Sequence, residues 1–213
     1  MNLPNFSFEK KLWSRGLTTI AGADEVGRGA FAGPVVAGCV VFSNTLTIKQ
    51  FNNNIVINDS KKLTPRARQE ASIWIKQNSL AWGIGECSVS KINSIGMSKA
   101  THIAFRKALS VVRSRLAIDF LLVDAFYVPF TRSLPKTNQL PIIKGDSLSI
   151  SIAAASILAK VYRDLLMQKL AKKYPHYHWH QNKGYGTLAH RQALQIHGPC
   201  VHHRTQFIQR LVT

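Results

Sequence analysis

The sequence predicts an α/β domain built on a mixed β-sheet, and three observations support this. Two segments rich in Val, Ile, Thr and Ala, residues 17–23 and 35–42, are strand-like and lie close together near the start of the chain. Short apolar runs at 120–123 and 140–143 are typical of strands buried on both faces. Helical patterns lie between and after these runs. Early strands followed by strands that alternate with helices indicate a mixed sheet flanked by helices.

The remaining elements follow from local signals. Thr64 before Pro65 predicts the start of a helix that runs to about residue 77, with Ala71, Ile73 and Trp74 facing inward. Residues 80–89 read as a third strand, and 98–115 as a basic amphipathic helix with Ile103, Ala104, Leu109 and Val112 near one face. Further helices are expected over 147–174, 188–197 and 204–212.

Length and composition bound the class of protein. The 213 residues predict a single domain with at most a small appendage. No apolar run reaches the roughly 18 residues of a membrane span, and the first residues do not resemble a signal peptide. The cysteines, Cys39, Cys87 and Cys200, are odd in number and far apart. We therefore expect reduced thiols, a cytoplasmic location and no membrane partner.

Charge is the strongest global signal. The chain has 28 Lys and Arg against 10 Asp and Glu, a formal net charge of +18. Such a charge attracts polyanions, and the basic residues are spread along the chain rather than gathered in one amphipathic helix. This distribution favours a broad groove for a nucleic-acid duplex.

The few acids are placed unevenly. Asp24, Glu25, Asp124 and Asp146 stand at the ends of expected strands, where sites form in open α/β sheets. Two unit charges about 5 Å apart repel by about 3 kcal/mol at an effective dielectric near 20, so such a cluster needs compensation. Carboxylates without His or Cys partners suit Mg²⁺ or Mn²⁺. A basic protein that gathers its acids in this way is expected to hold two metal ions against a phosphodiester.

Four of the chain's acids have a structural alternative. Asp146 precedes a helix and on its own favours an N-cap. Asp59 in "INDSKKL" favours a turn, and Asp119 the surface start of a strand. Asp164 favours an ion pair on its helix. Asp24 and Glu25, adjacent acids in a basic chain, have no such structural explanation.

Three other functions compete. "GRGAFA" at 27–32 matches a loose dinucleotide fingerprint, but a strand-like segment follows it instead of a helix. The His-rich stretch 176–180 and residues 200–203 could form a zinc site, but their spacing is irregular. A non-catalytic nucleic-acid-binding protein fits the charge and leaves the clustered acids unexplained.

Together these motifs resemble a known family. "AGADEVGRGAFAGPVVAGCVVF", "DSKKL", "LLVDAF", "IIKGDSLSISIAAASILAKVYRD", "KGYGT" and "HHRTQF" are similar, in order, to type 2 ribonuclease H, ribonuclease HII. The blocks run from about residue 20 to 207. The resemblance implies a ribonuclease H-like mixed sheet flanked by helices, with a helical C-terminal extension. We expect one catalytic domain over 1–213, with a core at about 17–173 and the extension at about 174–213.

The resemblance also implies an activity. It implies cleavage of RNA in RNA–DNA hybrids and incision 5′ to a ribonucleotide embedded in duplex DNA, leaving a 3′-hydroxyl and a 5′-phosphate. The metal-binding acids would be Asp24, Glu25, Asp124 and Asp146, with Mg²⁺ or Mn²⁺ as the cofactor. No sliding-clamp peptide is evident in "QFIQRLVT", and a monomer is expected.

Further site residues come from the same resemblance. It assigns the backbone of Gly27, Arg28 and Gly29 to the ribose 2′-hydroxyl, Tyr185 to the junction, and places Lys61 and Lys62 near phosphates. One position departs from many relatives, which carry Gly where this chain has Ala125.

Overall fold

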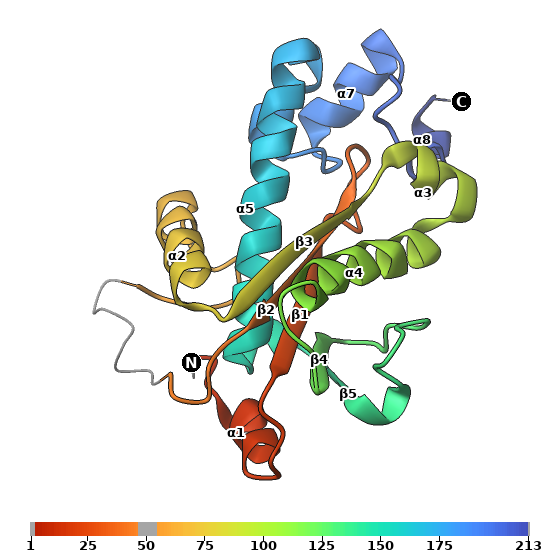
Figure 1. Ribbon diagram of the computed structural model, residues 1–213. Helices are drawn as coiled ribbons and strands as arrows, with labels where there is room; N and C mark the ends of the chain where they lie inside the picture. The colour runs from red at the N-terminus through yellow and green to blue at the C-terminus, as the bar shows by residue number, and fades with distance from the viewer. Residues whose placement is uncertain (1–2, 47–54, 213) are drawn as a thin grey trace.

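The computed structural model describes residues 3–46 and 55–212 (Figure 1). Its sheet has five strands in the order β3-β2-β1-β4-β5. The strands are β1 Ile20–Val26, β2 Val35–Val41, β3 Ala81–Cys87, β4 Phe120–Asp124 and β5 Gln139–Ile142. The α-helices are α1 Ser7–Trp13, α2 Pro65–Asn78, α3 Val89–Ile95, α4 Met97–Arg113, α5 Ile150–Lys173, α6 Trp179–Asn182, α7 Leu188–His197 and α8 Thr205–Val212.

The predicted mixed sheet is confirmed. β1, β2 and β3 pair antiparallel in sequence order, whereas β1 pairs parallel to β4 and β4 parallel to β5. The extent of the first strand was predicted wrongly, because pairing with β2 continues to Val26. Asp24 lies opposite Gly38 and Glu25 opposite Ala37, so both acids are inside β1 rather than after it.

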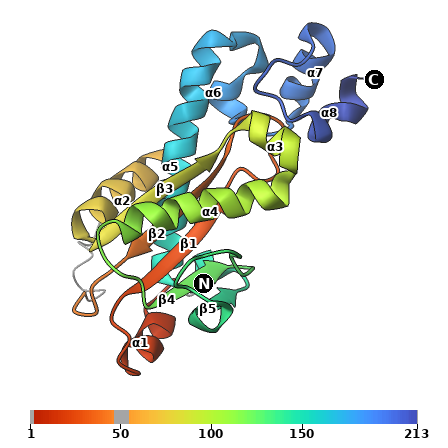
Figure 2. The same ribbon diagram turned by 45° about the vertical axis from the view of Figure 1, so that its right-hand side comes forward.

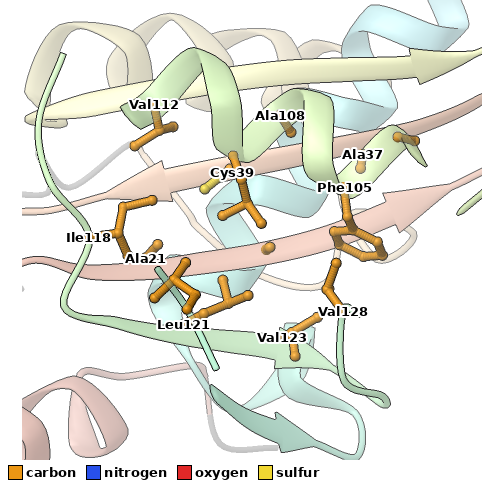
Figure 3. Packing of buried hydrophobic residues seen from close by; sticks show 14 of the residues in the cluster. Ala21, Ala37, Cys39, Phe105, Ala108, Val112, Ile118, Leu121, Val123 and Val128 are labelled. Carbon is orange, nitrogen blue, oxygen red and sulfur yellow. The ribbon is translucent and has the colours of Figure 1, made fainter. Parts of the chain in front are cut away.

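Helices cover both faces of the sheet, with α4 on one side and α5 on the other (Figures 1 and 2). On the α4 side, Phe105 and Val112 pack with Leu121 and Val123 of β4 in the main hydrophobic cluster (Figure 3). This burial of apolar surface is the chief source of stability.

On the opposite face, α5 lies very close to the sheet. A Cβ added at Gly22 would stand 2.2 Å from the carbonyl carbon of Ser151, and one at Gly38 would stand 2.2 Å from the carbonyl oxygen of Ala155. Only glycine in the strands and small residues in the helix permit this approach. It brings Ser156 of α5 to the carboxylate of Asp24.

Most predicted helices are confirmed, with particular errors. α2 begins as expected, with Thr64 accepting a hydrogen bond from the N–H of Ala67. Ile73 was placed inward wrongly: its side chain is 59% exposed, and Ile75 is buried instead. The helical period puts residues 71, 74 and 75 on one face and turns 73 away. Helices α1, α3 and α6 were not predicted.

The C-terminal helices form their own cluster at the far end of α5, away from α1 (Figures 1 and 2). Tyr177, Trp179 and Leu194 pack there with Met167 of α5. Thr187 caps α7 by accepting from the N–H of His190 at 3.4 Å, as its sequence signal predicts. The predicted helical C-terminal region is thus confirmed.

Two further features are the state of the cysteines and the length and polarity of the helices. The three cysteines are free thiols, and Cys200 is only partly buried. In the described ranges, every helix is too short or too polar to cross a membrane.

Candidate active site

One cavity of about 390 Å³ gathers most of the residues singled out in the sequence. It lies where β1 and β4 end. Asp24, Glu25 and Asp124 line it together with Lys61, Tyr185 and the loop 27–29. Because β1 and β4 are adjacent and parallel, their carboxyl ends meet at the same edge of the sheet.

Asp24 is the most deeply buried of these acids, with 5% of its surface exposed. Its Oδ1 accepts a hydrogen bond from the N–H of Glu25 at 2.7 Å. Burial raises its pKa well above the usual value, and the charge of Glu25 raises it further. The charges of Asp124 and Asp146 add to this increase, so the four carboxyl groups act on one another.

Asp124 and Asp146 come together through one backbone contact. Oδ1 of Asp124 accepts from the N–H of Gly145 at 2.7 Å, which fixes the turn that carries Asp146. Burial raises the pKa of both carboxyls, and neighbouring acids raise that of Asp146 further. Asp146 does not cap the long helix, because Ser149 is its N-cap and accepts from the N–H of Ile152. Asp146 is 8% exposed and is not among the residues that line the cavity.

The carboxylate of Glu25 is nearly buried, and its negative charge is only partly compensated by a neighbouring cation. Burial raises its pKa to about 7, although the cation of Arg28, 3.6 Å from Oε1, opposes this change. Its other oxygen, Oε2, is buried and has no hydrogen-bond partner among the described residues. A buried carboxylate oxygen without a partner is costly unless a ligand satisfies it.

Lys61 supplies the positive charge that faces these acids. Burial lowers its pKa, but Asp59, Asp146 and Asp24 outweigh this effect and raise it overall. Asp59 also shapes the turn, since its Oδ1 accepts from the N–H of Lys61 at 2.9 Å, as the sequence suggested. Lys62 is exposed and does not line the cavity.

The donor set fits a hard divalent cation. It consists of carboxylate oxygens with raised pKa values, one of them buried without a partner. Mg²⁺ and Mn²⁺ prefer such ligands. Across residues 3–46 and 55–212, no three His, Cys, Asp or Glu side chains already form a metal-ligating group.

Two buried arginines, which sequence reasoning missed, hold the glycine loop. Nη1 of Arg204 donates to the carbonyls of Gly27, Arg28 and Ala30 at 2.7, 2.9 and 2.8 Å, and its Nε donates to Gly33. Arg204 is fully buried, and burial lowers its pKa to about 9. Arg163 of α5 likewise donates to the backbone carbonyls of Ala32 and Pro34, which follow the loop, and to that of Lys183.

The carbonyl contacts of Arg204 set the direction of the loop's N–H groups. In a trans peptide the C=O and the following N–H point in opposite directions. With the carbonyls of Gly27 and Arg28 turned to Arg204, the N–H groups of Arg28 and Gly29 point away from it, and both residues line the cavity. Gly27 has φ 93°, a conformation that favours glycine.

Two further residues border the site. Tyr185 is half-buried, with the guanidinium of Arg163 5.4 Å and the ammonium of Lys160 6.0 Å from its ring centroid. Lys160 also pairs with Asp164 at 2.8 Å, which confirms the structural interpretation of that acid. Ala125, directly after Asp124, has φ 65°, which explains physically why glycine suits this position.

The other sequence alternatives do not agree with the fold. The glycines at 27–33 lead into strand β2 and not into the helix that a dinucleotide fingerprint requires. The His and Cys side chains of 176–203 form no metal-ligating group in the part of the chain that the structure describes.

Solved structures with the same fold are ribonucleases H. Ribonuclease H2 from Pyrococcus horikoshii OT3 superposes with a TM-score of 0.73 at 24% identity, covering 91% of this chain and 97% of that one. The chain is also similar to ribonuclease HII in a PCNA complex from Archaeoglobus fulgidus, with a TM-score of 0.69, 22% identity and coverage of 89% and 95%. Bst-RNase HIII, solved in complex with Mn²⁺, has a TM-score of 0.69 at 18% identity, with coverage of 92% and 70%.

Sequence comparison is more specific. The sequence model described as Ribonuclease HII matches residues 21–210. Ribonuclease HII of Caldanaerobacter subterraneus subsp. tengcongensis is 45% identical over 96% of this chain and 80% of that protein. The enzyme of Wolbachia pipientis subsp. Culex pipiens is 46% identical over 97% of each. The chain therefore belongs to the ribonuclease HII family of endonucleases, which degrade the RNA strand of RNA–DNA hybrids.

Proposed function

We propose that this protein cleaves RNA in RNA–DNA hybrids and also incises duplex DNA 5′ to a single embedded ribonucleotide, leaving a 3′-hydroxyl and a 5′-phosphate. The observation that carries the proposal is one cavity lined both by acids and by the glycine loop 27–29, on a chain of net charge +18. The non-catalytic alternative is not retained, because the family consists of nucleases.

Asp24, Glu25, Asp124 and Asp146 are the proposed ligands of Mg²⁺ or Mn²⁺, with two ions during catalysis. Two such ions activate water and neutralise charge on a phosphodiester. The similar fold of Bst-RNase HIII in complex with Mn²⁺ supports the class of ion. The protein's own contribution is a set of carboxyls whose pKa values are raised by burial and by neighbouring acids.

Recognition of the sugar is assigned to the loop. Only the 2′-hydroxyl distinguishes ribose from deoxyribose, so a selective enzyme must contact it. The N–H groups that Arg204 turns toward the cavity are suited to this contact, and Gly27 and Gly29 allow a close approach of the backbone. Tyr185 would pack on the sugar at the junction. Lys61 and Lys62 would lie near phosphates, Lys61 at the cavity and Lys62 beside it.

The chain as a whole is proposed to act as one catalytic domain and as a monomer in the cytoplasm. The core would span about 17–173, and about 174–213 would form the helical extension. The extension supports the proposal by supplying Tyr185 to the cavity and Arg204 to the loop. No clamp-binding peptide is proposed. The PCNA complex of the A. fulgidus protein concerns a chain that is 22% identical.

The decisive experiment maps cleavage of a DNA duplex that contains one ribonucleotide, with Mg²⁺ and Mn²⁺ compared. We expect a single cut 5′ to the ribonucleotide. Asp124→Asn should lower the rate by roughly 100-fold or more, since metal ions supply several kcal/mol of charge stabilisation, while duplex binding persists. Full activity of Asp124→Asn would remove this acid from the mechanism, and cleavage only within long hybrids would limit the function to hybrid degradation.

A further inference from the structure

A buried hydrogen-bond network of aromatic side chains lies among the C-terminal helices. His190, His203 and Trp179 expose no more than 2% of their surface. Nε2 of His190 lies 3.1 Å from both Nε1 of Trp179 and Nε2 of His203. The network ends on a backbone group at each side. Nδ1 of His203 accepts from the N–H of Cys200 at 2.9 Å, and Nδ1 of His190 lies 2.9 Å from the carbonyl of Tyr185.

These partners determine where each proton lies. The indole N–H of Trp179 and the amide of Cys200 can only donate, whereas the carbonyl of Tyr185 can only accept. Nε2 of His190 must therefore be unprotonated, and its Nδ1–H donates to Tyr185. Nδ1 of His203 must also be unprotonated, so the neutral ring of His203 carries its proton on Nε2. That N–H and the indole N–H of Trp179 share the single lone pair of His190 Nε2. Both imidazoles are neutral, in agreement with their burial, which lowers the pKa of both.

The carbonyl at one end of this network belongs to Tyr185, which borders the candidate site. Tyr185 lines the cavity of the acids. Its carbonyl also accepts from the N–H of Thr187 at 2.8 Å, so two donors hold the same peptide group. The ring and the carbonyl belong to one residue, so contacts at the carbonyl restrict the backbone that carries the ring.

We propose that His190 is a positioning residue for substrate recognition: it holds the backbone of Tyr185, and Trp179 and His203 lock it in the tautomer that can do so. The proposal rests on the role assigned to Tyr185 under the proposed function. His203 directly precedes Arg204, which holds the glycine loop. One dipeptide therefore reaches both recognition elements, Tyr185 through His190 and the backbone at 27–29 through Arg204.

The tautomers are measured on the wild-type protein. The ¹⁵N spectrum of histidine-labelled protein at neutral pH should show His190 protonated only at Nδ1 and His203 protonated only at Nε2. The opposite tautomer, or a doubly protonated ring at either residue, would refute the tautomers assigned to His190 and His203.

The positioning role is tested by two conservative variants with opposite expected defects. In His190→Gln the side-chain oxygen can accept near the place of Nε2, but the donor to Tyr185 is lost. In His190→Asn the amide nitrogen can donate near the place of Nδ1, but the acceptor for Trp179 and His203 is lost. We expect His190→Gln to remain the more stable and to lose about tenfold in kcat/KM on a duplex with one ribonucleotide, the effect of one hydrogen bond.

His190→Asn should be less stable, yet cleave that duplex within about threefold of wild type. If His190 were merely structural, activity would follow stability, and His190→Asn would be the poorer enzyme. Trp179→Phe is a matched control: it removes one of the two donors to Nε2 of His190, whereas His203 still donates there and keeps the proton of His190 on Nδ1. We therefore expect lower stability with cleavage retained.

A double-mutant cycle separates this proposal from the proposed function. In a Tyr185→Ala background, His190→Gln should cause no further loss, because it acts through Tyr185. If Tyr185→Ala alone leaves cleavage at one ribonucleotide unchanged, the role of Tyr185 in the proposed function fails. If Tyr185→Ala impairs cleavage but His190→Gln has no effect, or the two losses multiply, the positioning role of His190 fails.

Discussion

Glu25→Gln should make the metal-free protein more stable at alkaline pH. The side chain of Glu25 is 11% exposed, and burial raises its pKa to about 7 from an ordinary 4.5, despite the ion pair with Arg28. The folded state therefore binds this proton more tightly than the unfolded state does. The resulting stabilisation is fully present below pH 4.5 and is lost as pH rises through 7. The difference between the raised pKa of about 7 and the ordinary pKa of 4.5 corresponds to about 3 kcal/mol of folding stability. Glutamine does not ionise, so the variant does not lose this stability as the pH rises.

Urea unfolding in excess chelator measures the effect. Between pH 4.5 and pH 8, the stability of the variant relative to wild type should rise by up to about 3 kcal/mol. Added Mn²⁺ should reverse the order at pH 8, because an ion that binds only the folded state stabilises it by mass action and the variant has lost a proposed ligand. Glu70→Gln is the matched control: this acid is half-buried on α2 and paired with Arg66 at 2.9 Å, and loss of such a surface ion pair should change stability by less than about 1 kcal/mol.

Two results would refute the reasoning about Glu25. If the variant is no more stable than wild type at pH 8 in chelator, the carboxylate is compensated within the protein and its raised pKa is not a source of instability. If Mn²⁺ stabilises both proteins equally, Glu25 does not help to hold the ion. The first result concerns the electrostatics of the folded chain and the second its proposed role, so the two can fail independently.

Three further substitutions test the loop and the site. Arg204→Lys keeps a positive charge but loses the planar guanidinium, so some carbonyls of the loop lose their donor at about 1–3 kcal/mol each. Thermal unfolding measures this loss of stability. The preference for a ribonucleotide-containing over an all-DNA substrate should fall as well. An unchanged preference would disconnect Arg204 from recognition. Gly29→Ala should cost under about 0.5 kcal/mol, because a Cβ there meets no atom within 4 Å and the residue needs no left-handed backbone, yet it should slow cleavage by obstructing the sugar. Normal cleavage by that variant would place the ribose elsewhere. Ala125→Gly should stabilise the protein by about 1 kcal/mol in urea unfolding, since alanine at φ 65° is strained; a loss of stability would show that the strain is absent.

The elements that carry the acids could be predicted from the sequence because their signals are local. The apolar run that ends at Asp124 and the Val-rich segments around the glycine loop are visible within a few residues. The convergence of Asp24 with Asp124 then follows from the rule for adjacent parallel strands. The placement of Asp146 followed less directly, because it depends on the contact between the N–H of Gly145 and Asp124, 21 residues away.

The parts that could not be predicted depend on distant contacts. Arg204 reaches the carbonyl of Gly27 across 177 residues, and Arg163 reaches Pro34 across 129. A buried arginine paired with carbonyls rather than with an acid has no periodic or spacing signal. Both residues lie in the motifs quoted from the sequence, but neither was given a role there. Ile73 illustrates a nearer limit, since an apolar residue on an amphipathic helix can still face solvent.

The geometry would link the proposed position of cleavage to the proposed recognition of the sugar. Only Val26 separates the acids of β1 from Gly27, and Val26 still pairs with β2, so the proposed acid ligands and the loop are joined by paired backbone. The carbonyls of that loop are held by Arg204, which contacts none of the acids. A change at Arg204 should therefore alter which nucleotide is accepted before it alters the carboxylates that are proposed to cut. Conversely, neutralising an acid should leave the loop and its N–H groups in place. Selectivity and rate are thus expected to respond to different substitutions, although the residues concerned line one cavity.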